Sequence, residues 1–213
     1  MPSSKNERRI TMKLRLLGAI LVCSIGVLGT GCNKQEKTES KPEQKLEQKS
    51  EPQNPPSSQV VKEFTFEDGT GKWWPIGSVK VEKATNQKHT GNASAKISGS
   101  SPNGGWAYAL TDRFPLEPGK KYKFTGWVLV ESVSNAKYPP VLRVGMFQQK
   151  QKWLQNALTS KYDLSHKGEW QMFSTEFTAP GECDSAEISL EKGTQDSMTV
   201  TAYLDDLKIE SAQ

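Results

Sequence analysis

Short stretches rich in β-branched and aromatic residues alternate with clusters of Gly, Pro, Asn and Ser between residues 61 and 213. This pattern is typical of strands separated by turns, and no long stretch repeats with the period of an α-helix. Many short strands at this spacing predict an all-β fold, a two-sheet β-sandwich. The segment 150–158 also admits a short helical turn. The strands are predicted at 62–66, 77–83, 93–98, 105–111, 121–131, 141–149, 169–178, 185–191 and 199–210.

Side chains that alternate along a strand point to opposite faces of its sheet. Both faces of the segment 122–130 carry apolar groups, which predicts a central strand that is covered on both sides. In 141–149, Arg143, Phe147 and Gln149 fall on the face opposite three aliphatic residues. One face of that strand therefore combines an aromatic ring with polar groups.

The first 31 residues have the pattern of an export signal. Five basic residues and one acidic residue accompany an apolar run, Leu16–Leu28, that is 13 residues long. A membrane-spanning helix needs about 20 apolar residues, so this run is typical of a secretory signal, starting at Met1 or Met12. The rest of the chain has 23 basic and 23 acidic residues. It lacks the positive surplus of a nucleic-acid-binding domain, so no nucleic acid is expected as a partner.

The apolar run ends in Leu28-Gly29-Thr30-Gly31-Cys32, which resembles the lipobox of bacterial lipoproteins, although Gly29 stands where that motif usually has leucine. The resemblance implies a signal peptide over 1–31 and a lipidated Cys32, carrying palmitate-type acyl chains, as the mature N-terminus. Such chains would hold the product at the cell membrane or outer membrane, facing the outside. The alternatives are a lipid on Cys23 and a signal peptide that is cleaved without lipidation.

Residues 32–60 follow as a linker rich in Lys, Glu, Gln, Ser and Pro, which cannot bury enough apolar surface to offset its chain entropy. Lysines recur every fourth residue from Lys37 to Lys49, so a helix would stack like charges. We therefore expect a disordered tether before a folded domain over 61–213. Within that domain Cys183 is the single cysteine, which excludes an intramolecular disulfide.

Several sequence pieces occur in order along the predicted domain: Phe66-Glu67-Asp68-Gly69 before Trp73-Trp74, His89-Thr90-Gly91-Asn92-Ala93-Ser94, the segment 116–128, Gly168-Glu169-Trp170 before Phe177-Thr178-Ala179-Pro180, and Tyr203-Leu204-Asp205-Asp206-Leu207. Their order and spacing resemble the CenC-like carbohydrate-binding modules (families 4, 9, 16 and 22) of the galactose-binding-like group. The resemblance covers essentially all of 61–213. It implies a two-sheet jelly roll that binds glycans without cleaving them.

Asp205 falls in phase with apolar residues of the last predicted strand, and a buried ionised carboxylate is costly unless it is paired or bound to a metal. Oxygen-rich loops with carboxylates suit calcium. The resemblance implies a structural calcium ion that ties the first strand to the last through Glu67 and Asp205, with carbonyl groups from the loop 89–92. The alternative is that turn amides hydrogen-bond the Asp205 carboxylate.

Sugar rings present an apolar face and a rim of hydroxyls, which aromatic rings and polar side chains bind respectively. Of the six tryptophans, Trp74, Trp127 and Trp170 fall in motif positions that suit a framework role. Other aromatic residues lie in strand or loop contexts outside the motifs, and any one of them is alternatively a core residue. The expected carbohydrate-binding residues are Trp106, Tyr108, Trp153, Arg143, Phe147 and Gln149, with Trp106 and Tyr108 sharing one face.

The sequence contains no catalytic motif. His89 and His166 are the only histidines, and no nucleophile elbow, zinc-binding motif or phosphate loop occurs. We therefore expect a non-enzymatic, monomeric, surface-exposed lipoprotein that binds a polysaccharide or oligosaccharide. One alternative is a protein-binding adhesion or envelope-assembly module of the same fold. Another is a glycoside hydrolase, since the sequence does not exclude two carboxylates beside a cleft.

Overall fold

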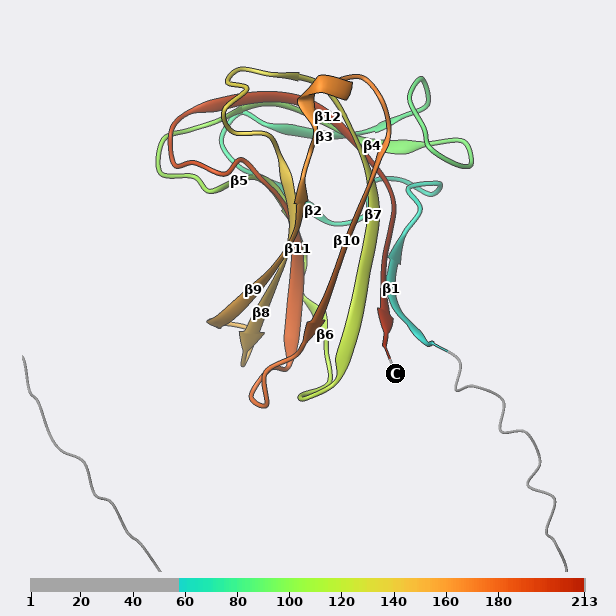
Figure 1. Cartoon of the computed structure of the whole chain (residues 1–213), viewed down its shortest axis with the longest axis vertical. Helices are drawn as coiled ribbons and strands as arrows, with labels where there is room; N and C mark the ends of the chain where they lie inside the picture. Colours follow the sequence, from blue (N-terminus) through green and yellow to red (C-terminus); the bar gives the residue numbers. More distant parts are fainter. Residues whose placement is uncertain (1–57, 213) are drawn as a thin grey trace, which may run out of the picture. The chain divides into compact units, whose positions relative to one another are not determined.

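The computed structural model describes residues 58–212. The predicted signal peptide, the predicted lipid site Cys32 and the tether up to residue 57 lie outside the described residues. Within 58–212 the chain forms twelve β-strands and one short 3-10 turn, η1 (Leu164–His166). Figure 1 shows the strands arranged in two layers. In this part of the chain no helix has the length and apolar character needed to cross a bilayer.

The first sheet has six strands in the order β10-β7-β12-β4-β3, with β1 paired to the end of β12. All of its pairs are antiparallel. One edge of β12 pairs with β7, while its other edge pairs first with β4 and then with β1. The bounds are β1 (Val60–Phe64), β3 (Lys80–Ala84), β4 (Ser94–Ser101), β7 (Lys121–Val133), β10 (Gln171–Thr178) and β12 (Met198–Ser211).

The second sheet has six strands in the order β2-β5-β11-β8-β9, with β6 also paired to β11. Its pairs are antiparallel as well. The bounds are β2 (Trp73–Pro75), β5 (Ala107–Thr111), β6 (Phe114–Pro115), β8 (Val141–Gln148), β9 (Lys152–Lys161) and β11 (Ser185–Glu191).

The hydrophobic core fills the space between the two sheets. Alternate residues of each strand face it, for example Leu142, Val144 and Met146 of β8. A fully buried aliphatic side chain contributes roughly 1.5–3 kcal/mol, so this interior layer is the main source of stability in a domain without disulfides. The opposite face of the second sheet is turned away from the core and carries the polar and aromatic side chains described below.

The predicted all-β sandwich is confirmed, and each of the nine predicted strands overlaps an observed one. The predicted central strand 122–130 lies in β7, between β10 and β12. The short strands β2 and β6 were not anticipated. The helical turn considered for 150–158 is wrong, because this segment is a hairpin turn followed by β9, whose residues pair with β8. Leu154 and Ala157 of β9 pack against the core on the inner face.

Two β-bulges change which face a side chain occupies. In β5, Ala109 and Ala107 pair with consecutive residues of β11, so Tyr108 between them is the extra residue. In β12, Asp205 pairs opposite Trp127 and the next pair is three residues further on, with the intervening Asp206 at a positive φ of 48°. The alternation along each strand therefore shifts by one residue at these points.

Candidate functional site

A groove of about 610 Å³ lies on the face of the second sheet that points away from the core. Its wall and floor come from β5, β8, β9 and β11 together with the segments that flank β5. Trp106 precedes β5, and Arg113 follows it. The lining residues are Trp106, Leu110, Arg113, Arg143, Phe147, Trp153, Asn156, Glu187 and Glu191.

Strand alternation places the floor residues. Arg143 and Phe147 occupy the face of β8 opposite its core residues, and Gly145 lies between them. A Cβ atom at Gly145 would lie 3.2 Å from Nη2 of Arg143 and 3.3 Å from Cε2 of Phe147. Glycine thus leaves space that an ordinary side chain would fill, and the groove keeps its depth at the middle of the sheet.

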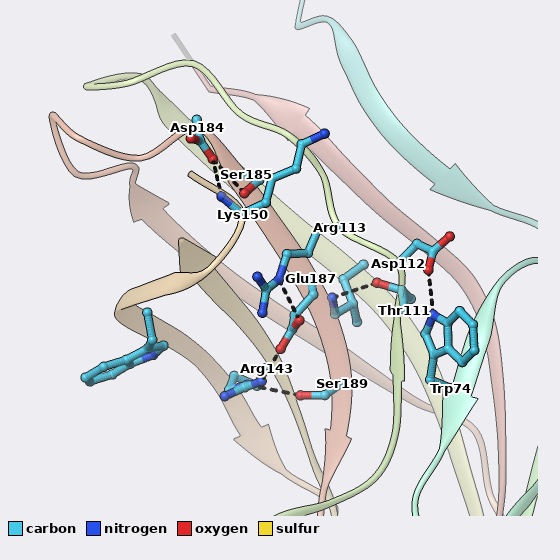
Figure 2. A network of polar contacts seen from close by, with 12 residues as sticks. Trp74, Thr111, Asp112, Arg113, Arg143, Lys150, Asp184, Ser185, Glu187 and Ser189 are labelled. Carbon is cyan, nitrogen blue, oxygen red and sulfur yellow. Dashed lines mark hydrogen bonds and ion pairs between the residues drawn. The ribbon is translucent and has the colours of Figure 1, made fainter. Parts of the chain in front are cut away.

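A network of charged groups crosses the floor, and its centre is the buried carboxylate of Glu187. Nη2 of Arg143 donates to Oε1 of Glu187 at 2.9 Å, and Nε of Arg113 donates to Oε2 at 3.2 Å. Nε of Arg143 lies 3.0 Å from Oγ of Ser189 and 3.2 Å from Oε1 of Glu191. Figure 2 shows Glu187 between the two arginines, with Ser189 beside Arg143.

Each arginine also stacks on an aromatic ring of the groove. The guanidinium carbon of Arg143 lies 3.7 Å from the ring centroid of Trp106, and that of Arg113 lies 3.5 Å from the ring centroid of Phe147. Such cation–π contacts contribute about 0.5–2 kcal/mol each, more when the cation is desolvated. The arginines therefore fix the positions of two aromatic side chains as well as that of Glu187.

Burial shapes the electrostatics of this floor. Arg143 is 6% exposed, and desolvation lowers the pKa of its guanidinium, although arginine keeps its proton in proteins. Burial also raises the pKa of the Glu191 carboxyl, while the nearby Arg143 lowers it. A buried charge without a partner would be strongly destabilising, so the arginines and the glutamates depend on one another.

Trp153 lies at the β9 side of the groove and is 56% exposed. Its indole Nε1 donates to Oδ1 of Asn156 at 2.8 Å, and Nη1 of Arg143 donates to the same oxygen at 3.4 Å. Trp106, on the opposite side of the floor, is 36% exposed and has Arg143 against its ring. Two partly open indoles thus flank a polar floor whose side chains hold each other in place.

The structure brings four of the six predicted carbohydrate-binding residues to this groove, namely Trp106, Arg143, Phe147 and Trp153. The prediction for Tyr108 is wrong, because the bulge in β5 turns its ring into the core, where it is fully buried. Its hydroxyl has no hydrogen-bond partner among the described residues, and burial raises its pKa. Gln149 is exposed in the β8–β9 turn, outside the groove lining.

Five groove residues were not predicted, namely the apolar Leu110 and four polar residues. Glu187 and Glu191 alternate with three apolar residues of β11, so period-two alternation in 185–191 was a usable signal for them. Asn156 was obscured by the helical turn considered for its segment. Arg113 lies in the short connection between β5 and β6, where no alternation applies.

The predicted metal residues, Glu67 and Asp205, both reach the loop 89–93. Oε1 of Glu67 accepts hydrogen bonds from the backbone N–H groups of Asn92 at 2.8 Å and Ala93 at 3.3 Å. Oδ2 of Asp205 accepts from the N–H groups of His89 at 2.8 Å and Thr90 at 3.2 Å. The two carboxylates therefore tie the region after β1 and the strand β12 to one loop.

The environments of these two carboxyl groups differ. Hydrogen bonds from the loop, first from Asn92, lower the pKa of Glu67, whereas burial raises the pKa of Asp205. The bulge in β12 puts Leu207 and Ile209 on the core face, so the expectation that Asp205 shares that face is wrong, although its burial is confirmed. Within 58–212 no cluster of three or more His, Cys, Asp or Glu side chains is placed to hold a metal ion.

Comparison with curated proteins finds endo-1,4-beta-xylanase A of Thermotoga maritima, 28% identical over 156 residues that make up 71% of this chain. The enzyme of the same name from Thermotoga neapolitana matches equally, at 28% over 156 residues. The chain spans only 14% of the length of either relative.

Solved structures share the fold. The CBM22-1–GH10 modules of Clostridium thermocellum xylanase 10B, in complex with xylohexaose, superpose with a TM-score of 0.55 at 19% identity, covering 70% of this chain and 28% of that one. The CBM22-1 xylan-binding domain of Paenibacillus barcinonensis Xyn10C superposes with a TM-score of 0.53 at 16% identity, covering 75% of this chain and 99% of that one. The family model described as a carbohydrate binding domain, CBM_4_9, matches residues 58–198. Because this match covers most of the described residues, the chain belongs to that carbohydrate-binding family.

Proposed function

We propose that the groove binds a neutral polysaccharide of the xylan type and does not cleave it. The observation that carries the proposal is the groove itself, in which Trp106 and Trp153 flank an ion-paired floor centred on Glu187. The expectation of glycan binding from sequence agrees with the family to which the chain belongs.

The groove offers the two kinds of contact that a sugar needs. Indole rings cover the apolar C–H face of a sugar ring, and fixed polar groups bond to its hydroxyls. Trp153 supplies an exposed ring. The Nη groups of Arg113 make no hydrogen bond to the described residues, so they are donors for a ligand, and the carboxylate of Glu191 is an acceptor.

The charges of the groove favour a neutral ligand. Two arginines are balanced by two glutamates, and each arginine lies within ion-pair distance of a glutamate. A polyanionic glycan would need a surplus of cationic side chains, which this lining does not have. Two of the similar solved structures are described as xylan-binding domains, which supports a xylan-type chain as the ligand.

The same network disfavours hydrolysis. A glycosidase needs one carboxyl group as a proton donor and a second as a base or nucleophile. Both oxygens of Glu187 accept hydrogen bonds from guanidinium groups, so neither oxygen is free to serve as a proton donor to a glycosidic oxygen. Glu191 would then be the one carboxyl group in the groove lining that is left for a catalytic role, and one is not enough. The groove therefore binds a glycan without cleaving it.

Isothermal titration calorimetry with xylo-oligosaccharides, together with affinity gel electrophoresis in soluble xylan, tests this proposal. We expect binding by the unaltered chain and at least a tenfold weaker affinity for Trp153→Ala, because the open ring is lost. Met172→Ala is the matched control, since Met172 is 58% exposed on β10 of the other sheet. Unchanged affinity of Trp153→Ala, or release of reducing ends from xylan, would contradict the proposal.

We also propose the predicted lipid anchor, which is supported by the sequence pattern that ends at Cys32. Lipidation there would tether the glycan-binding domain to a membrane surface. Metabolic labelling with a palmitate analogue should mark the full-length chain in a bacterial host, and Cys32→Ser should abolish the label. Labelling that persists in Cys32→Ser but disappears in Cys23→Ser would favour the alternative site.

A structural calcium ion held by Glu67 and Asp205 remains a proposal. Asp205 is buried, and no cationic side chain among the described residues forms an ion pair with it, so a divalent cation would suit its charge. Calcium takes six to eight oxygen ligands, so carbonyl groups of the loop 89–92 would have to complete the set. The ammonium of Lys83 donates to the main-chain carbonyl of Glu67 and is a competing source of positive charge.

A further inference from the structure

We propose that Trp74 on β2 is an additional stacking position for the polysaccharide, so that a bound chain extends from β9 across the whole second sheet to β2. This inference rests on the proposed function of the groove and lengthens its binding surface beyond the residues that line it. The motif position of Trp74 suited a framework role from sequence, yet the structure leaves this side chain 59% exposed.

Strand register places Trp74 on the groove face. Its neighbour Trp73 is buried in the core, so Trp74 points to the opposite side of the sheet. Trp74 pairs across the strands with Leu110, which lines the groove, and Leu110 pairs in turn with Ser189. Trp74 therefore lies directly beside the groove wall, one strand further out.

The same register continues to the other edge of the sheet. Ser189 pairs with Arg143, and Arg143 pairs with Leu158 of β9, which is an exposed residue. This row of side chains crosses five strands, and four strand spacings amount to about 19 Å. A single sugar ring would occupy only part of that distance, so the row suits an extended chain that runs across the strands.

The ring of Trp74 is free to stack. Among the described residues, Trp73, Trp106, Trp127 and Trp170 each have an aromatic ring or a guanidinium against them. No such partner lies against Trp74 or Trp153 in 58–212, and both are more than half exposed. These two are the most exposed of the tryptophans, and they lie on the two outermost strands of the order β2-β5-β11-β8-β9.

The orientation of the Trp74 ring is also set in advance. Its indole Nε1 donates to Oδ1 of Asp112 at 2.5 Å, and Nζ of Lys72 lies 3.6 Å from the other oxygen of the same carboxylate. Figure 2 shows the Trp74 indole beside Asp112, with a dashed line marking their hydrogen bond. A ring held in place loses less conformational freedom when a ligand binds, which favours affinity.

Two consequences distinguish this surface from a groove limited to Trp106 and Trp153. Affinity should rise with oligosaccharide length until the chain reaches Trp74. Because both end positions lie on edge strands, the chain should bind by its interior, and its two ends should extend past the sheet on either side.

Calorimetric titration of the unaltered chain and of Trp74→Ala, Trp74→Phe and Met172→Ala, with xylobiose through xylohexaose, tests the inference. We expect Trp74→Ala to weaken xylohexaose binding about tenfold and to leave xylobiose binding within twofold, because a short ligand stays in the groove. Trp74→Phe keeps a ring and should recover most of the affinity, which also guards against a folding defect. Met172→Ala should match the unaltered chain.

The outcomes separate the two proposals. If Trp153→Ala loses xylohexaose affinity and Trp74→Ala does not, the groove binds glycan and the extension to β2 is wrong. If Trp74→Ala weakens xylobiose and xylohexaose equally, the length argument is also wrong. Failure of the unaltered chain to bind any of the oligosaccharides would overturn the proposed function and this inference together.

Discussion

Glu187→Gln is the sharpest single perturbation of the groove floor. The substitution preserves the shape of the side chain but replaces one carboxylate oxygen by an NH2 group. One of the two donors, Nη2 of Arg143 or Nε of Arg113, would then face another donor in a buried site. The charge that both guanidinium groups neutralise would be lost as well.

The expected cost follows from these contacts. A hydrogen bond to a charged group contributes about 1.5–3 kcal/mol, and breaking a buried ion pair costs about 3–5 kcal/mol. In the variant, Oε1 of Glu191 remains 3.2 Å from Nε of Arg143, and Arg113 is partly exposed to water. The loss of stability should therefore lie toward the lower end of these ranges. We expect the free energy of unfolding to decrease by about 2–3 kcal/mol.

Urea denaturation of residues 58–212, followed by tryptophan fluorescence, measures this change. With a slope of about 1–3 kcal/mol per molar urea, the midpoint should fall by roughly 1 M. Glu182→Gln is the matched control, because Glu182 is an exposed partner of Lys152 and its ion pair should be worth less than about 1 kcal/mol. A Glu187→Gln midpoint equal to that of the control would refute the reasoning that this carboxylate organises the floor.

Three further predictions address other parts of the domain. Gly145→Ala should weaken xylo-oligosaccharide binding several-fold in calorimetry, because its Cβ would press on Arg143; unchanged affinity would show that the floor yields. Tyr108→Phe should be neutral or raise the free energy of unfolding by up to about 1 kcal/mol, because it removes an unpartnered hydroxyl; a clear loss would reveal a hidden partner. EDTA should lower the Tm by several degrees if calcium is bound; an unchanged Tm, with Lys83→Met lowering it instead, would assign the cation role to Lys83.

The sequence predicted the fold and the site correctly where side chains alternate regularly along a strand, and it failed where that alternation is interrupted. In β8 the alternation is regular, so the sequence correctly assigned Arg143 and Phe147 to the face opposite the core. β-Bulges broke the same rule at Tyr108 and Asp205. A bulge depends on which residue of the neighbouring strand is paired, and that information is not local to the strand.

The strand β9 shows a second kind of limit. Its exposed face carries Lys, Gln and Asn, so the segment has few of the residues that favour strands. Pairing with β8 along its length overrides this weak local preference. Because no strand was predicted over β9, the sequence did not show which strand Trp153 pairs with. For the same reason it did not place Asn156 beside Trp153.

The balanced charges of the groove have a consequence for the conditions under which the domain works. Dissolved ions weaken the attraction between separated opposite charges. They should have little effect on the binding of an uncharged ligand to a groove floor whose charges are already paired with one another. Glycan capture should therefore proceed equally well in dilute fresh water and in brine. A groove of this kind would keep its hold on an uncharged glycan through large changes in salt concentration.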